Sequence, residues 1–231
     1  MTLTDLKSEW QDHPQFHASV MDYFASQVNA DDELRIHRDW VNDNEWGFGE
    51  KSFHWLWKLL VDEMPEQFEF LEIGVYRGAV LSLINILARR VNKVAWVNGV
   101  TPLDSSDGYK ESNYADDIRR IHEVFDCDLD YNIIKGKSCD VVDEVKELAP
   151  FDMVYIDGDH SYAGCKFDLL TYAPMVKKGG WLLIDDAGRY FNLPEGMYSG
   201  HEEISNAMRD WDSEGFEFWF NLGHLVVYKR K

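Results

Sequence analysis

The sequence predicts an α/β fold: a mostly parallel sheet that is covered by helices on both faces. From residue 68 onward, short apolar runs alternate with segments of helical period, which is typical of strands joined by helical crossovers. Glycines or paired acids follow several of these runs. Parallel sheets bind ligands at the carboxyl ends of their strands, so this pattern also favours a parallel sheet. The chain finishes in two strand-like runs joined at Leu222 and Gly223, which indicates an antiparallel hairpin.

The first 66 residues read as a helical, aromatic-rich segment. Apolar residues recur at helical spacing over 5–28 and 50–64, and a turn-rich loop, 42–50, separates the two runs. We therefore expect an N-terminal helical cap or lid segment at 1–66 and a second domain at 67–231. Four residues in and beside this loop are candidates for a lid over a binding site: Trp46, Phe48, Lys51 and Ser52.

The second region alternates regularly between strands and helices. Right-handed crossovers between parallel strands bury the sheet on both faces, which explains why its strands are almost continuously apolar. The expected strands are 68–75, 94–100, 131–136, 151–157 and 179–185, followed by the hairpin within 216–230, and the expected helices are 79–91, 113–125, 139–148, 162–176 and 201–211.

The charge of the chain excludes some classes of partner. Asp and Glu total 42 against 23 Lys and Arg, so the formal net charge is −19. Such a chain repels nucleic-acid phosphates and anionic membrane surfaces. We therefore expect a small-molecule partner, with no nucleic acid and no membrane. The aromatic-rich N-terminal segment points in addition to a homo-oligomer.

Cysteine usage and the N-terminal residues predict a cytoplasmic protein. Three well-separated cysteines, Cys127, Cys139 and Cys165, suit neither a disulfide framework nor a zinc knuckle. The first residues are polar, unlike a signal peptide. No apolar run approaches the roughly 20 residues that a membrane span needs. A reducing compartment is therefore expected.

The first strand of the second region ends in LEIGVYRG, residues 71–78. Gly74 and Gly78 flank the turn into the next helix, and Glu72 lies two residues before Gly74. Glycines let a ligand approach the backbone, and the carboxylate can accept a hydrogen bond from an ammonium group. Tyr76 occupies the middle position of the G-x-G-x-x-G pattern, which argues against a dinucleotide fold. Taken alone, the glycines also fit a purely structural turn.

Acidic residues follow two other predicted strands. Asp157 ends the run 151–157, and Asp185 and Asp186 end the run that follows Gly179 and Gly180. If these strands are neighbours, their carboxylates meet, and the repulsion raises their pKa values. A hard divalent cation such as Mg²⁺ relieves that repulsion. Loop capping is the alternative explanation for Asp185 and Asp186.

His160 lies three residues after Asp157, within reach of a molecule that a metal there would hold. A neutral imidazole can take a proton from a substrate hydroxyl, and a metal lowers the pKa of that hydroxyl. A lone histidine is usually structural, but its position at an acidic strand end favours a catalytic role. Asp159 suits a role in this site and a helix N-cap equally well. Arg189, Tyr190 and His201, on the long loop after Asp186, are candidates for substrate contact.

The motifs LEIGVYRG, YIDGDHSY and KKGGWLLIDD together resemble those of the class I S-adenosylmethionine (SAM)-dependent methyltransferases. The chain from about residue 68 looks, more narrowly, like the metal-dependent O-methyltransferases that include the macrocin and mycinamicin type of sugar methyltransferase and relatives from cephalosporin biosynthesis. The resemblance implies a Rossmann-like three-layer sandwich. Its seven-stranded sheet would end in the hairpin described above.

The same resemblance implies roles for individual residues. Asp157, Asp185 and Asp186 match the metal ligands, and His160 matches the general base. Ser138 matches a position near the adenine. The implied residues that bind the cofactor SAM are Glu72, Gly74, Tyr76, Gly78, Asp104, Ser138 and Asp157.

Two positions depart from the family pattern. Thr101 stands where the second strand commonly ends in an acid that binds the ribose hydroxyls, and Asp104 follows three residues later. Lys137 stands where an acid is common beside the adenine. The departures concern the ribose and adenine contacts and leave the metal ligands unaffected.

These features predict an enzyme, a SAM-dependent and divalent-metal-dependent O-methyltransferase that acts on a hydroxyl of a small molecule. A sugar, a natural product or a catechol-like diol would suit the metal. Two other functions stay open: a metal-dependent hydrolase or lyase on the same fold, and a methyltransferase-fold protein that binds a ligand without catalysis. The first would not need the cofactor motif, and the second would have no reason to keep uncompensated carboxylates together.

Overall fold

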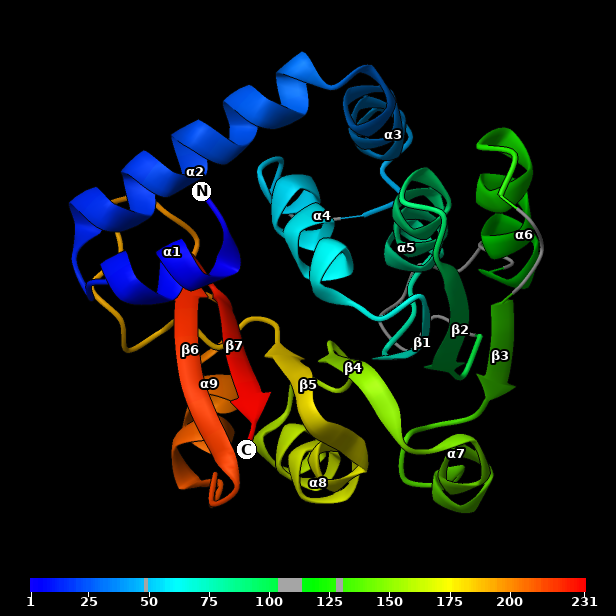
Figure 1. Ribbon diagram of the computed structural model, residues 1–231. Helices are drawn as coiled ribbons and strands as arrows, with labels where there is room; N and C mark the ends of the chain where they lie inside the picture. The colour runs from blue at the N-terminus through cyan, green and yellow to red at the C-terminus, as the bar shows by residue number, and fades with distance from the viewer. Residues whose placement is uncertain (48–49, 104–113, 128–130) are drawn as a thin grey trace.

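A computed structural model describes residues 1–47, 50–103, 114–127 and 131–231, and these ranges contain one seven-stranded sheet (Figure 1). Its strand order is β3-β2-β1-β4-β5-β7-β6. The first five of these strands are parallel, whereas β7 runs antiparallel to both β5 and β6. The predicted mostly parallel sheet with a C-terminal hairpin is therefore confirmed. The strands are β1 Gln67–Ile73, β2 Val94–Thr101, β3 Tyr131–Lys135, β4 Phe151–Ile156, β5 Val176–Ile184, β6 Phe216–Leu222 and β7 Leu225–Arg230.

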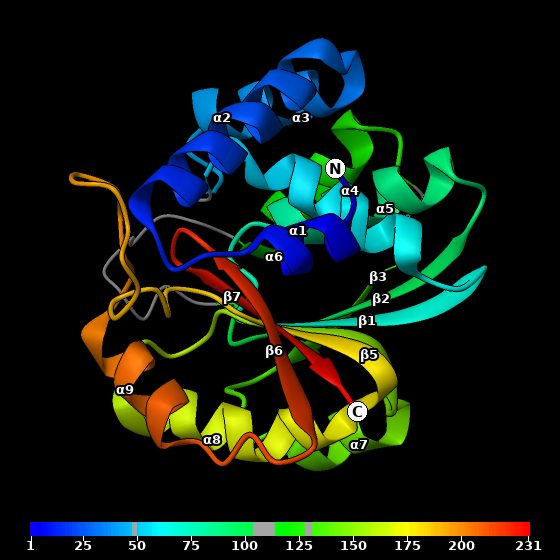
Figure 2. The same cartoon turned by 60° about the vertical axis from the view of Figure 1, so that its left-hand side comes forward.

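Helices cover both faces of the sheet, which gives the three layers of a Rossmann-like sandwich. One face carries the N-terminal helices α1 to α4 together with α5 and α6, and the other carries α7, α8 and α9 (Figures 1 and 2). The helices are α1 Leu3–Glu9, α2 Pro14–Ala30, α3 Asp32–Asp43, α4 Phe53–Glu63, α5 Ala79–Arg90, α6 Tyr114–Val124, α7 Val142–Leu148, α8 Tyr162–Tyr172 and α9 Glu202–Asp210.

The core is divided between the two faces by the alternation of side chains along each strand. In β1, Phe68 and Phe70 pack into a cluster with α1 to α5, and Leu71 and Ile73 pack into a second cluster with α7 to α9. All four side chains are almost fully buried. The period of two along a strand thus accounts for the near-continuous apolar run.

The predicted helix over 5–28 is broken into α1 and α2. Pro14 occupies the first turn of α2, where the missing N–H costs nothing, but the same proline prevents α1 from continuing. The His13 imidazole caps α2 by accepting a hydrogen bond from the Gln15 N–H. A second proline, Pro174, lies in a single 3₁₀ turn that follows α8, so that helix ends at Tyr172 rather than at residue 176.

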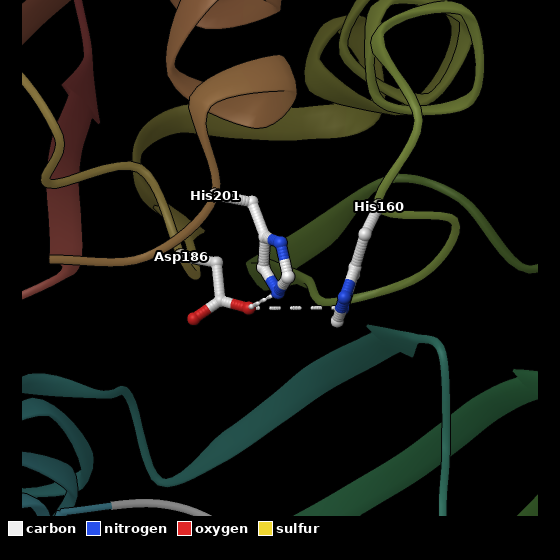
Figure 3. A group of neighbouring side chains, drawn as sticks. All are labelled: His160, Asp186 and His201. Atoms are coloured by element: carbon white, nitrogen blue, oxygen red, sulfur yellow. Dashed lines mark ion pairs between the residues drawn. The ribbon is translucent and has the colours of Figure 1, made fainter. Parts of the chain in front are cut away.

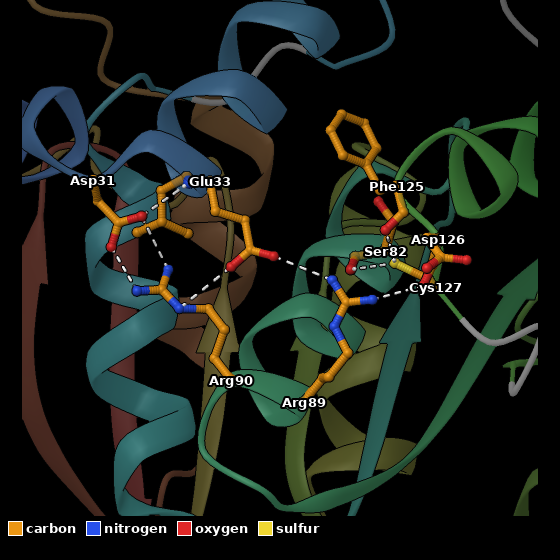
Figure 4. Close-up of polar contacts among 9 residues, drawn as sticks. Asp31, Glu33, Ser82, Arg89, Arg90, Phe125, Asp126 and Cys127 are labelled. Carbon is orange, nitrogen blue, oxygen red and sulfur yellow. Dashed lines mark hydrogen bonds and ion pairs between the residues drawn. The ribbon is translucent and has the colours of Figure 1, made fainter.

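The N-terminal helices pack into the same hydrophobic cluster as the sheet, and ion pairs hold them from outside. Arg90, in the last turn of α5, pairs with Asp31 at 2.6 Å and with Glu33 at 3.4 Å (Figure 4). Arg89 joins Glu33 to the Asp126 carbonyl oxygen after α6. These contacts tie the start of α3 to α5 and α6. A lid role for residues 1–66 stays a prediction, and Phe48 lies outside the described residues.

The order of the strands determines where a ligand would bind. The chain switches direction across the sheet between β1 and β4, and open α/β sheets bind ligands outside the carboxyl ends of the strands at such a point. Tyr155 and Ile156 of β4 lie beside Leu183 and Ile184 of β5. The residues that follow these two strands are therefore neighbours. Among the described residues, no helix combines the length and apolar character of a membrane span.

Candidate active site

A buried carboxylate lies near the carboxyl end of β1, directly before the turn into α5. Glu72 is only 4% exposed, and its Oε2 has no hydrogen-bond partner among the described residues. Burial, with Asp157 and Asp185 nearby, raises the pKa of Glu72 well above its ordinary value. An isolated buried carboxylate destabilises a fold. A cationic group, such as the ammonium group of an amino acid, would supply the partner that Oε2 lacks.

The two glycines of this turn have left-handed backbone conformations. Gly74 has φ +102°, and a Cβ there would lie 1.9 Å from the carbonyl oxygen of Asp157. Gly78, with φ +82°, is the N-cap of α5, and no side chain caps the helix there. The backbones of β1 and β4 thus approach closely, and the N–H groups at the start of α5 are left for a ligand. Tyr76 packs edge-on against Tyr114, with ring centroids 5.1 Å apart, at the side of this turn.

Asp157 and Asp185 lie side by side, joined by a tyrosine that the sequence had not singled out. The buried Tyr155 hydroxyl donates to Asp185 Oδ2 at 2.6 Å and lies 3.3 Å from Asp157 Oδ2. Burial and the neighbouring Asp185 raise the pKa of Asp157 to about 7. Tyr155 was predictable in principle, because it lies two residues before Asp157 and so points to the same face of the strand.

Two imidazoles from different parts of the chain lie close to the Asp186 carboxylate. His201 Nε2 lies 3.4 Å, and His160 Nε2 3.8 Å, from Asp186 Oδ2 (Figure 3). His160 follows β4, where its Nε2 is also 3.5 Å from Asp157 Oδ1, and His201 is the N-cap of α9. The hydrogen bond with Asp157 raises the pKa of His160. Both rings are partly exposed, so both can reach a bound molecule.

A tight backbone turn presents Asp186. Its φ is +55°, a left-handed conformation that non-glycine residues adopt rarely. The Asp186 carbonyl oxygen accepts a hydrogen bond from the His201 N–H at 2.8 Å, and a Cβ on Gly200 would lie 2.1 Å from that oxygen. Next along the chain, the Ala187 N–H donates to the His224 carbonyl oxygen at 2.8 Å. The His201 bond therefore closes the loop 187–200 at its base, and the Ala187 bond ties its start to the turn between β6 and β7.

A third histidine, His224, completes the cluster and was missed by sequence reasoning. It lies in the turn between β6 and β7, is 4% exposed, and places Nε2 3.3 Å from Asp185 Oδ1. The Tyr198 ring packs edge-on against it at 5.0 Å. The only signal was its position directly after the hairpin glycine, at the end of β7 that lies beside the carboxyl end of β5.

Asp159 does not cap helix α8. Its Oδ1 accepts from the Ser161 N–H at 2.9 Å, and the Ser161 hydroxyl is the cap that accepts from the Gly164 N–H at 3.1 Å. The alternative of an N-cap at Asp159, which the sequence left open, is thus excluded, because the N-cap is Ser161. The carboxylate holds the turn that leads from His160 into the helix.

The predicted adenine side of the site is built around Ser138. Its carbonyl oxygen accepts a 2.5 Å hydrogen bond from the Tyr172 hydroxyl. Asp168, which is fully buried on α8, lies near Ser138, and neither of its oxygens has a hydrogen bond of normal geometry among the described residues. Thr101 is buried at the end of β2, and its hydroxyl accepts from the Leu103 N–H. Asp104 lies outside the described residues.

The donor set at this edge suits a divalent cation. One oxygen each of Asp185 and Asp186 and one nitrogen of His224 lie within 4.8 Å of one another, and the same holds for His160, Asp186 and His201. Carboxylate oxygens meet the requirement of Mg²⁺, and the mutual repulsion of Asp157, Asp185 and Asp186 would be relieved by a positive ion. The structure therefore fits both groups that the sequence implied, an ammonium-bearing cofactor at Glu72 and a metal beside Asp185.

A family model described as "Methyltransferase domain" matches residues 71–187, slightly more than half of the chain. The chain belongs to this methyltransferase family. The matched range runs from β1 to the acids after β5 and so contains the residues described above. A curated relative, the uncharacterised protein R132 of Acanthamoeba polyphaga mimivirus, is 27% identical over 180 residues, which cover 72% of this chain and 75% of the relative.

Solved structures share the fold of this methyltransferase at low sequence identity. A candidate caffeoyl-CoA O-methyltransferase from Staphylococcus aureus has a TM-score of 0.65 at 14% identity and covers 91% of this chain and 99% of its own. The SAH-bound methyltransferase PaMTH1 of Podospora anserina has a TM-score of 0.58 at 16% identity, over 90% and 95% of the two chains. An O-methyltransferase from Bacillus cereus in complex with SAH has a TM-score of 0.54 at 15% identity, over 92% and 91%. The predicted class I methyltransferase fold is confirmed.

Proposed function

We propose that this methyltransferase transfers the methyl group of SAM to a hydroxyl of a small molecule that is bound beside a divalent metal. The observation that carries the proposal is the carboxyl edge of β1, β4 and β5. There, the buried Glu72 carboxylate, whose Oε2 has no hydrogen-bond partner among the described residues, lies next to a second set of acids that have histidines beside them. Two separate needs for positive charge, one at each end of the edge, match an ammonium-bearing methyl donor and a metal.

The residues of the chain divide into three roles. Glu72 would accept a hydrogen bond from the ammonium group of SAM, and Gly74 and Gly78 leave room and N–H donors for the methionine part. Asp157, Asp185 and Asp186 would hold the metal. When bound, SAM supplies an activated methyl group, and the metal lowers the pKa of a hydroxyl beside it.

His160 would take the proton of that hydroxyl. Its Nε2 lies near Asp157 and Asp186, so it stands where an acceptor next to the metal would be. Asp157 orients the ring through the hydrogen bond that they share. Alignment of donor and acceptor can supply up to about 7–11 kcal/mol of the barrier reduction, which leaves removal of one proton as the main chemical task of the protein. His201, whose ring is 4.6 Å from that of His160, is the second candidate for this role.

The acceptor would be a vicinal diol. Two adjacent oxygens can both reach one metal, and a sugar or a catechol offers such a pair. Support for a metal together with the cofactor comes from a structural relative with a TM-score of 0.51, which is described as the mycinamycin-pathway methyltransferase MycE in complex with Mg and SAH. That relative is 17% identical, and the match covers 79% of this chain and 51% of that one.

The first test is calorimetric titration of the protein with SAM, with added Mg²⁺ and after chelation. Binding in either condition supports the cofactor site, and Glu72→Gln should then weaken it, because the ammonium loses a charged partner worth about 1.5–3 kcal/mol, or roughly 10–100-fold in affinity. Absence of binding in both conditions would overturn the proposal and leave the hydrolytic or non-catalytic functions.

The second test separates the two candidate bases. A screen of sugars and catechols identifies an acceptor, and turnover is then measured for His160→Gln and His201→Gln. We expect His160→Gln to keep SAM affinity and to lose about 10²–10⁴-fold in turnover, as removal of a general base does. Near wild-type turnover in that variant, with a loss in His201→Gln, would move the proton transfer to His201.

A further inference from the structure

The inference that follows rests on the proposed function and concerns which metal the site takes. The three acids expected from the sequence offer oxygen only. The structure adds His224, which reaches the same place from the turn between β6 and β7, beside the carboxyl end of β5. A nitrogen donor changes the chemistry of the site, because Mg²⁺ strongly prefers oxygen, whereas imidazole suits first-row transition metals.

The position of His224 is that of a ligand. Donor atoms around one ion at about 2.1 Å lie roughly 3 to 4.2 Å apart. His224 Nε2 is 3.3 Å from Asp185 Oδ1, and one donor atom each of Asp185, Asp186 and His224 lie within 4.8 Å of one another. Small side-chain movements would therefore bring the three donors around one ion.

His224 is held in place by packing. It is 4% exposed, and the Phe53 and Tyr198 rings contact it with centroids 5.1 and 5.0 Å away. Its Nδ1 has no hydrogen-bond partner among the described residues, so the ring direction comes from its aromatic neighbours. A buried imidazole that directs Nε2 at a metal-binding carboxylate is fixed before any ion arrives.

A simple ion pair with Asp185 is the competing explanation. It would leave Asp157 and Asp186 with only the more exposed His160 and His201 as positively charged partners. The Tyr155 hydroxyl already donates a hydrogen bond to Asp185 at 2.6 Å. Asp185 therefore has a donor without His224, and the excess of negative charge around it still calls for a cation.

We propose that His224 is a metal ligand, and that the site it forms with Asp157, Asp185 and Asp186 selects a transition metal such as Co²⁺, Mn²⁺, Fe²⁺ or Zn²⁺ over Mg²⁺. The nitrogen donor provides the selectivity, and the carboxylates provide the charge. His160 and His201, which are more exposed, stay outside this donor set and face the acceptor.

The experiment compares two metals on three proteins. Co²⁺ is titrated into wild type, His224→Asn and Asp185→Asn while its visible d–d absorption is recorded, and Mg²⁺ binding to the same proteins is measured by calorimetry. Asparagine keeps similar size and offers an oxygen donor in place of nitrogen. SAH binding in the presence of a chelator and circular dichroism are measured for each protein as controls of folding and of the cofactor site.

We expect His224→Asn to weaken Co²⁺ binding at least about 10-fold, to change the Co²⁺ spectrum, and to leave Mg²⁺ affinity within about 3-fold. Asp185→Asn should weaken the binding of both Co²⁺ and Mg²⁺. Equal effects of His224→Asn on the two metals, or an unchanged Co²⁺ spectrum, would overturn the proposal even if SAH binds normally. Failure of SAH to bind wild type would instead count against the proposed function, and the metal result would still stand by itself.

Discussion

Asp168 allows a quantitative prediction, because it is a fully buried carboxylate that the proposed chemistry does not use. Burial raises the pKa of Asp168 to about 6, against an ordinary 3.8, although Ser138 lowers it in part. A group that holds its proton more tightly when folded destabilises the protein as pH rises through that range. The destabilisation is about 3 kcal/mol at pH 7.5 and about 1.6 kcal/mol at pH 5.0, since one pKa unit is worth 1.36 kcal/mol.

Asp168→Asn removes this ionisation and keeps the shape of the side chain. We expect its stability relative to wild type to increase by about 1.4 kcal/mol between pH 5.0 and pH 7.5, or roughly 3–6 °C in melting temperature for a protein of this size. Any cost of the buried amide is the same at both pH values and cancels in the difference. Urea unfolding at the two pH values measures it, with Asp22→Asn, at an exposed position on α2, as the matched control.

The result that would refute the reasoning is a pH-independent difference between wild type and Asp168→Asn. It would mean that the carboxylate ionises at its ordinary pKa, so that water or a neighbouring group solvates it. A pH dependence of the same size in Asp22→Asn would instead show that the effect belongs to the overall charge of the protein.

Two further predictions concern the backbone at Gly74 and the partly buried His54. Gly74→Ala should lower the free energy of unfolding, measured in urea, by more than about 3 kcal/mol, because its Cβ would meet the Asp157 carbonyl. The control Gly196→Ala, also at positive φ but with open space around it, should lower it by about 1 kcal/mol. Equal losses in the two variants would contradict the close approach of β1 and β4. Burial lowers the pKa of His54 to about 3. Below about pH 6.5 the imidazole is therefore protonated in the unfolded chain but stays neutral in the folded protein, which lowers the stability of the fold. Wild type should therefore lose up to about 2 kcal/mol through this residue between pH 7 and pH 5, and His54→Gln should lose correspondingly less; an identical loss in both proteins would exclude His54 as the cause.

The sheet was predictable from the sequence because strand periodicity is a local property. Asp157 and Asp185 could be placed together once their strands were taken as neighbours, and the pairing of β4 with β5 confirms that step. Pro14 and Pro174 could have indicated where the helices break, but the apolar residues continue at helical spacing on both sides of each proline, and the sequence therefore predicted longer helices. The sequence left a helix N-cap at Asp159 open because Asp and Ser cap helices almost equally well, and only the backbone shows which one does.

His224 was beyond prediction for a different reason. It reaches Asp185 only because β7 pairs with β5 and the hairpin turn lies at the carboxyl edge of the sheet. That contact joins residues 39 positions apart in the chain through strand order, for which no local pattern exists. Tyr155 differs, since its position two residues before Asp157 was a signal that simple alternation could have used.

The closed base of the loop 187–200 has a consequence for how substrate choice can change. The hydrogen bond from the His201 N–H to the Asp186 carbonyl oxygen holds the two ends of the loop together, and the bond from the Ala187 N–H ties its start to His224. Lengthening a loop whose ends are already joined adds only about 0.6 kcal/mol for each doubling. New residues between positions 189 and 197 can therefore be grafted to reach other acceptors while the Asp186 carboxylate, and Tyr198 against His224, keep their places, which makes this segment an exchangeable part of an otherwise fixed catalyst.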